Sequence, residues 1–234
     1  PFMVELDELP ATTLPFVDRK HFRSIDKFRH EPNWDSTLYL QKIWPFIKNK
    51  IPGAECHIYG SYPPPKATAL NNPKSGFLIK GWTDNALTMM QEHRVCLAPI
   101  RFGAGIKGKL LDAMKMQTPS ITTLVGSEGM HEQESWPGVI TDDFTEFVEA
   151  AVELYNSEQK WIDAQNNCAT LLRARYDGQT LGAQLIEKII ETEKNLAQHR
   201  LNNFTGGMLK HHSMMSTKYM SQWISAKNAI ASKN

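Results

Sequence analysis

A glycine-rich segment with two lysines is the part of this chain whose residues most directly indicate chemistry. The stretch GAGIKGK (103–109) combines three glycines with Lys107 and Lys109. The apolar run 95–100 before it predicts a buried strand, and 110–116 after it predicts a helix. In such a strand–turn–helix unit, free backbone N–H groups and the helix dipole favour an anion. We therefore expect this loop to bind the phosphate or pyrophosphate of a nucleotide derivative.

Charged side chains in and after this loop suggest how the rest of such a ligand would be held. Lysine is unfavourable at a helix N-terminus, so the placement of Lys107 and Lys109 favours a bound pyrophosphate over two solvated surface lysines. Asp112 follows one helical turn later on the same side and would accept hydrogen bonds from ribose hydroxyls, or is an ordinary surface residue. Arg29 follows the first predicted strand, and its guanidinium suits a phosphate oxyanion.

The elements around these residues alternate between strands and helices, which predicts an α/β fold: a Rossmann-like parallel sheet flanked by helices, with extra helices at the C-terminal end. In such sheets ligands bind at the carboxyl ends of the strands. The predicted strands are 21–25, 54–59, 76–80, 94–100, 119–123 and 139–141. The predicted helices are 35–49, 66–72, 85–93 (with Asp84 as its cap), 108–116 and most of 144–197, the last broken at Gly178.

Three regions follow from this pattern. Residues 1–20 are rich in proline, which predicts a linker or the remnant of a preceding domain. Residues 21–197 are predicted to form the nucleotide-binding domain. Residues 198–234 are predicted to form a tail or a crossover helix.

Composition narrows the class of protein. The chain has 234 residues and a net charge of +1, which gives no basic field for nucleic acid. Its three cysteines are far apart and indicate buried free thiols in a reducing compartment, so we expect a cytoplasmic protein. No signal peptide or membrane-spanning run is visible, and no triad or metal-ligand spacing is apparent. We expect no metal and no cofactor.

The spacing of Gly103, Gly105 and Gly108 also fits a dinucleotide fingerprint, with Glu128 twenty residues further on. That fingerprint belongs in the first strand–turn–helix unit of a domain, whereas here it follows the fourth strand. An NAD-dependent oxidoreductase is therefore the less favoured interpretation.

Four segments of the chain resemble a known family. PIRFGAGIKGKLLDAMKMQTPSITTLVGSEGM (99–130), HFRSIDKFRHEPNWDS (21–36), ECHIYG (55–60) and GFLIKGW (76–82) are similar to the C-terminal half of retaining glycosyltransferases of the group 1 (family 4) type. The resemblance implies one half of a two-domain GT-B fold, the half that binds the nucleotide-diphosphate sugar donor, UDP- or GDP-linked.

The resemblance also implies roles for individual residues. Arg29 and Lys107 would be catalytic, stabilising the diphosphate that leaves. Asp112 matches the second of two family glutamates, the one that holds the ribose, and the first falls at Ala104. The residues implied in donor binding are Lys27, Arg101, Gly103, Ala104, Gly105, Ile106, Lys109, Asp112, Gly126, Ser127, Glu128 and Gly129.

Two departures from the family keep an alternative open. Ala104 stands where a carboxylate would contact the donor sugar. Nothing before His21 forms the N-terminal domain that supplies the acceptor site. We therefore expect that an N-terminal domain acts with this chain, either in cis or in trans. Any contact with a membrane would be made through that domain. We expect the isolated chain to be inactive. The alternative is a non-catalytic GT-B-like module that binds a nucleotide or a partner protein.

Overall fold

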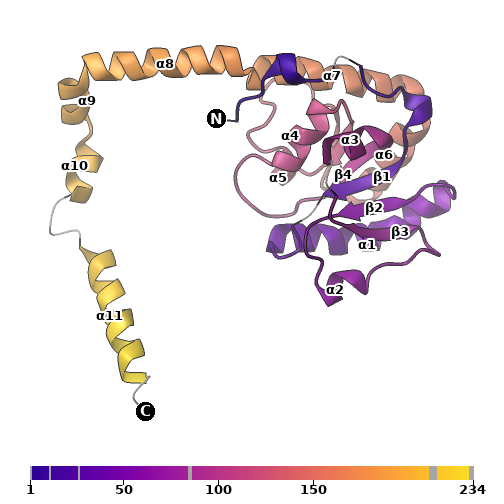
Figure 1. Ribbon diagram of the computed structural model, residues 1–234, viewed down its shortest axis with the longest axis horizontal. Coiled ribbons are helices and arrows are strands. Elements are labelled where there is room, and N and C mark those ends of the chain that lie inside the picture. The colour runs from indigo at the N-terminus through magenta and orange to yellow at the C-terminus, as the bar shows by residue number, and fades with distance from the viewer. Residues whose placement is uncertain (1, 11, 26, 84–85, 211–214, 232–234) are drawn as a thin grey trace. The chain divides into compact units, whose positions relative to one another are not determined.

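Six strands form a single parallel sheet in the order β3-β2-β1-β4-β5-β6 (Figure 1). The fold is that of a computed structural model, which describes residues 2–10, 12–25, 27–83, 86–210 and 215–231. The strands are β1 (Lys20–Ile25), β2 (Cys56–Tyr59), β3 (Phe77–Gly81), β4 (His93–Ala98), β5 (Ser120–Thr122) and β6 (Gly138–Ile140). The α-helices are α1 (Glu31–Lys50), α2 (Pro65–Thr68), α3 (Ala86–Glu92), α4 (Gly108–Lys115), α5 (Leu124–Ser127), α6 (Phe144–Asn156), α7 (Glu158–Tyr176), α8 (Gly178–Lys194), α9 (Leu196–Asn202), α10 (Phe204–Lys210) and α11 (Ser216–Ala231).

This strand order confirms the Rossmann-like parallel sheet that the alternating pattern predicts. The direction of winding reverses between β1 and β4, which lie side by side in the middle of the sheet. A ligand crevice in such a sheet opens at the carboxyl ends of those two strands. The loops that follow β1 and β4 therefore occupy the position where a binding site is expected.

Helices cover both faces of the sheet, and alternate strand residues pack against each layer. Phe22 of β1 and Val95 of β4 belong to a core that also contains Trp44 of α1 and Phe147 of α6. The other core joins α4 to α7, and the Tyr176 hydroxyl donates to the Met130 carbonyl at 2.9 Å within it. Burial on both faces explains why the strands read as short apolar runs rather than as alternating ones.

The N-terminal segment packs on this domain. Val4 is buried, donates its N–H to the Tyr176 carbonyl at 2.7 Å and pairs with Asp177 in a short bridge. Arg19, immediately before β1, is fully buried. The segment predicted as a linker or a remnant, residues 1–20, is thus attached to the domain at Val4, beside the end of α7, and at buried Arg19.

Several boundaries differ from the predicted ones. Helix α1 begins at Glu31 rather than at 35, because Pro32 fits the first turn of a helix, where its missing N–H is not needed. A second break, at Ser157, separates α6 from α7, and the Ser157 side chain caps α7. The loop predicted after β5 contains the one-turn helix α5, capped by Thr123. Asp84 lies outside the described residues.

The chain divides into two compact units, with the boundary between Leu181 and Gly182. The second unit is helical, comprising most of α8 together with α9, α10 and α11. Its exposed apolar side chains include Ile186, Trp223 and Ile224. None of the helices in the described ranges has both the length and the hydropathy that crossing a bilayer requires.

Candidate functional site

A cavity of about 560 Å³ lies between the loop after β1 and the loop after β4. It is at the carboxyl edge of the sheet, where the winding reverses. Its lining residues are Ile25, Lys27, His30, Pro32, Asn33, Ile100, Phe102, Gly103, Ala104, Ile106, Lys107, Gly108 and Lys109. Six of these belong to the set predicted from sequence: Lys27, Gly103, Ala104, Ile106, Lys107 and Lys109.

Two helices begin at this cavity, and neither is capped by a side chain. His30 precedes α1 and Lys107 precedes α4, and neither of these two side chains makes a capping hydrogen bond to its helix. By contrast, the Asp143 side chain caps α6 and accepts from the Glu146 N–H at 2.8 Å. The positive end of each of the two helix dipoles therefore faces the cavity without a capping side chain. The cavity is therefore suited to an anion with more than one oxygen.

Cationic side chains add to this field. Lys107 is half-buried, and its ammonium donates to the Gly105 carbonyl at 2.6 Å, which holds the side chain against the loop. Burial lowers the pKa of Lys107, while the charge of nearby Glu128 raises it. Lys27, in the loop after β1, and Lys109, in the first turn of α4, also line the cavity. An anion entering the cavity would thus meet cations from both loops.

The glycines of the loop allow its backbone conformation. Gly103 and Gly105 have φ values of +134° and +75°, a region that other residues rarely adopt. A Cβ atom on Gly103 would make only an ordinary contact, 3.6 Å from the side chain of Pro32. The turn between β4 and α4 therefore needs glycine for its dihedral angles rather than for space.

The segment after β5 forms a neighbouring hollow of about 390 Å³, lined in part by Ser127, Glu128 and Gly129. The Thr122 hydroxyl donates to the Ala98 carbonyl at 2.8 Å, which ties the end of β5 to the end of β4. A Cβ atom on Gly129 would lie 3.7 Å from Ile106 of the glycine loop. The predicted residues 127–129 thus lie beside the cavity rather than in its wall.

Five other predicted residues line neither hollow. Arg101 forms an ion pair with Asp35, and its guanidinium lies over the Tyr39 ring, 4.9 Å from the centroid. Asp112 on α4 pairs with Lys115 at 3.3 Å. Arg29 is exposed, Gly105 contributes to the turn, and Gly126 is packed on Thr122.

Sequence reasoning did not select the first turn of α1 as part of the site. Pro32 and Asn33 line the cavity, together with His30 before them. The signal was present in HEPN (30–33), where a proline after an acidic residue is typical of a helix start. The apolar pattern alone predicts a helix start at residue 35 instead.

The sequence matches the family described as glycosyl transferases group 1 over residues 26–157, more than half of its length. The chain belongs to the group 1 glycosyl transferases. The matched region includes both walls of the cavity and the segment after β5. A search of curated proteins finds no match.

Solved structures agree on the fold. A point mutant of TarM from S. aureus, in complex with fondaparinux, α-GlcNAc-glycerol and UDP, is similar with a TM-score of 0.66 and 13% identity, over 79% of this chain and 38% of that one. A glycosyltransferase from Rickettsia africae is similar with a TM-score of 0.64 and 12% identity, over 83% of this chain and 56% of that one. Sucrose-phosphate synthase from Thermosynechococcus elongatus is similar with a TM-score of 0.61 and 15% identity, over 83% of this chain and 52% of that one. The chain thus has the fold of one GT-B half and spans between 38% and 56% of the length of these three structures.

Proposed function

We propose that this chain is the donor-binding half of a retaining, family 4-type glycosyltransferase and that its cavity holds the diphosphate of a nucleotide sugar. The observation that carries the proposal is the meeting of two uncapped helix N-termini with Lys27, Lys107 and Lys109 at one cavity. Such an arrangement offers backbone N–H groups and cations to the same anion.

The chemistry proposed for this site is stabilisation of a leaving group. As the bond between the sugar and the diphosphate breaks, negative charge grows on the diphosphate oxygens. Donors fixed before the reaction stabilise that charge without having to reorganise. Lys107 and the amides at the start of α4 would act this way, with exposed Arg29 as a second cation. Asp112 would bind the ribose after turning away from Lys115.

The donor base and an acceptor-binding half are also proposals. Structures with the same fold were solved with UDP, among them TarM, the pneumococcal O-GlcNAc transferase GtfA and Anabaena HepE. These favour a uridine diphosphate sugar here. Because the chain spans 38% of TarM, we propose that an acceptor-binding half acts with it, in cis or in trans.

A second candidate function is binding without turnover. Ala104 is exposed and lines the cavity at the position where the family resemblance places a carboxylate against the donor sugar. A site with this change would keep its contacts to the diphosphate and lose one to the sugar. A non-catalytic nucleotide-binding module would show this pattern.

A thermal-shift panel tests the proposal on the chain as it exists. UDP, GDP, a UDP-sugar and NAD are each added in excess, because a ligand that binds only the folded state raises the melting temperature. At a hundred times the Kd the stabilisation is about 2.7 kcal/mol. We expect a rise with UDP and none with NAD. A rise with NAD alone would support the oxidoreductase instead. A UDP-sugar that stabilises no more than UDP would favour the non-catalytic module.

A further inference from the structure

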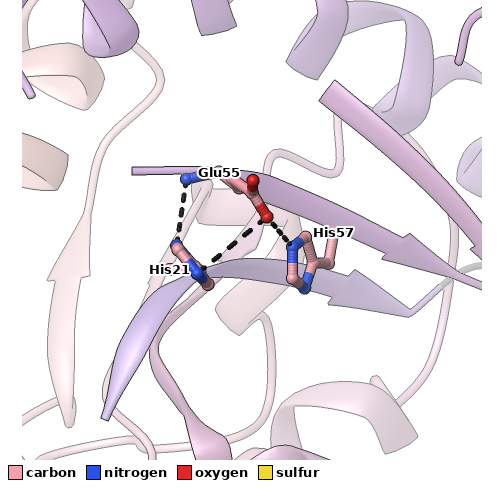
Figure 2. A group of neighbouring side chains, drawn as sticks. All are labelled: His21, Glu55 and His57. Carbon is pink, nitrogen blue, oxygen red and sulfur yellow. Dashed lines mark hydrogen bonds and ion pairs between the residues drawn. The ribbon is translucent and has the colours of Figure 1, made fainter. Parts of the chain in front are cut away.

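Three side chains that are far apart in the sequence meet at the amino ends of the strands, the edge opposite the cavity. They are His21 of β1, Glu55 just before β2 and His57 of β2 (Figure 2). The Glu55 Oε2 atom lies 2.8 Å from His57 Nε2 and 3.9 Å from His21 Nε2. One donor atom from each residue lies within 4.8 Å of the others. Imidazole nitrogens with a carboxylate oxygen form the donor set of many transition-metal sites.

The backbone at His21 departs from the strand in a way that directs its ring toward this cluster. Its φ of 63° is left-handed, which is uncommon for a residue other than glycine. Its N–H leaves the strand ladder and donates to the Tyr155 hydroxyl at 3.1 Å. The His21 and His57 rings then lie 5.2 Å apart between centroids. This conformation costs free energy and is held by contacts with Tyr155 of α6 and with Glu55 and His57 at the start of β2.

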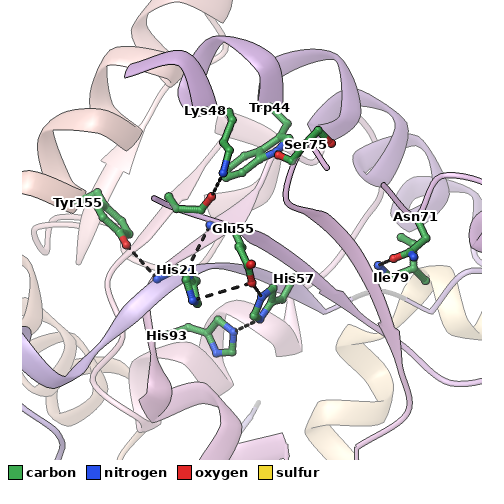
Figure 3. A network of polar contacts seen from close by, with 11 residues as sticks. His21, Trp44, Lys48, Glu55, His57, Asn71, Ser75, Ile79, His93 and Tyr155 are labelled. Atoms are coloured by element: carbon green, nitrogen blue, oxygen red, sulfur yellow. Dashed lines mark hydrogen bonds and ion pairs between the residues drawn. The ribbon is translucent and has the colours of Figure 1, made fainter. Parts of the chain in front are cut away.

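A hydrogen-bond chain continues from His57 to His93 (Figure 3). His93 Nδ1 lies 2.8 Å from the Met89 carbonyl, His57 Nδ1 lies 2.8 Å from His93 Nε2, and His57 Nε2 lies 2.8 Å from Glu55 Oε2. Because the Met89 carbonyl only accepts, a neutral His93 carries its proton on Nδ1 and accepts through Nε2. A neutral His57 then donates from Nδ1 to His93 and turns its Nε2 lone pair toward Glu55. In this tautomer His57 Nε2 and Glu55 Oε2 can ligate the same cation.

We propose that His57 Nε2, Glu55 Oε2 and His21 Nε2 form a binding site for one divalent transition-metal ion, Zn²⁺ in particular. The ion would lie between His57 Nε2 and Glu55 Oε2, with His21 Nε2 as the third ligand. His93 would fix His57 from behind, since a ligating histidine usually donates its other N–H to a neighbour. The inference stands apart from the proposed function, because the site is at the other edge of the sheet and needs no nucleotide.

The geometry requires small adjustments. Tetrahedral Zn²⁺ with bonds of 2.0–2.1 Å separates its donor atoms by about 3.3 Å. The His57–Glu55 pair would open from 2.8 Å, and His21 would close from 3.9 Å. His21 Nδ1 now accepts from the Glu55 N–H at 3.2 Å, so ligation through Nε2 moves the ring proton to Nδ1 and breaks that contact. Water would complete the fourth position.

Zinc titration of the chelator-treated full chain tests the site. ZnCl₂ is added to the wild-type chain and to the His21→Asn and Glu55→Gln variants, and binding is followed by calorimetry. Asparagine tolerates a left-handed backbone, so His21→Asn removes the ligand at the smallest cost to folding. His199→Ala, on exposed α9, is the matched control, and His211→Ala/His212→Ala removes the histidine pair of the C-terminal region. Circular dichroism checks that each variant is folded.

We expect one Zn²⁺ per chain, about tenfold or more weaker binding in both cluster variants, and unchanged binding in both histidine controls. Co²⁺ in place of Zn²⁺ should give a visible absorption band that the cluster variants lose. The proposal is overturned if the folded wild-type chain binds no zinc, if the cluster variants bind it as well as the wild type does, or if the binding disappears with His211 and His212.

Discussion

Individual residues of the site could be predicted where their roles are local. Gly103, Gly108 and the two lysines of 103–109 act through their own turn and helix start, so the sequence predicts their place at the cavity. Arg101 could not be judged this way, because its partner Asp35 is 66 residues away. The same holds for His21, whose left-handed conformation depends on Tyr155 and on the residues around Glu55.

Two fully buried arginines show how residues of one type can differ in their effect on stability. Arg19 donates to the Leu14 carbonyl at 2.8 Å and to the Thr118 hydroxyl at 2.9 Å, and its guanidinium lies 5.0 Å from the Trp161 ring centroid. Arg23 of β1 has no hydrogen-bond partner for Nε, Nη1 or Nη2 among the residues that the structure describes. Burial lowers the pKa of both, that of Arg19 to about 10.

Arg23→Met is therefore expected to leave the free energy of unfolding unchanged or to raise it, by up to about 3 kcal/mol, because it removes an unpaired buried charge. Arg19→Met should lower it by about 2–4 kcal/mol, since the acceptors around Arg19 lose their donor. Urea denaturation of the two variants measures the difference. Equal destabilisation would mean that Arg23 has a partner that this account misses.

At the scale of elements, the order of strands and helices could be predicted from apolar runs and turn residues. The starts and ends could not, because they depend on neighbouring elements. Helix α1 starts at Glu31 with Pro32 in its first turn, and α7 starts at a serine cap within an unbroken helical pattern. Gly138 at the start of β6 also has a role that appears only in three dimensions, because it lies directly against β5.

Gly138→Ala should be strongly destabilising. A Cβ atom there would lie 1.9 Å from the Ser120 carbonyl oxygen, and the φ of +138° is one that alanine rarely adopts. We expect a loss of about 3 kcal/mol or more in the free energy of unfolding, from overpacking and backbone strain together. Gly53→Ala, where nothing lies within 4 Å of the added Cβ atom, is the control and should change the urea midpoint little. A Gly138→Ala variant as stable as Gly53→Ala would contradict the β5–β6 packing.

At the scale of the whole molecule, the fold class and the family resemblance could be predicted from order and spacing alone. Two loops about seventy residues apart in the sequence form one cavity. They meet because the strand order of the parallel sheet reverses between β1 and β4, and a crevice opens at such a point. The detailed lining could not be predicted, because it depends on how α1 and α4 approach each other. The cluster of His21, Glu55 and His57 was missed for a similar reason, since only β1 and β2 side by side bring it together.

The central claim is that the cavity between these loops binds a nucleoside diphosphate through Lys107 and the start of α4. The most direct test is the Kd of UDP, measured by isothermal titration calorimetry for the wild-type chain, Lys107→Ala and Lys74→Ala. Lys74 is an exposed lysine outside the cavity lining and serves as the control. A hydrogen bond to a charged group contributes about 1.5–3 kcal/mol, so Lys107→Ala should weaken binding about 10- to 100-fold while Lys74→Ala leaves it unchanged. Equal affinity of all three proteins for UDP would contradict the account.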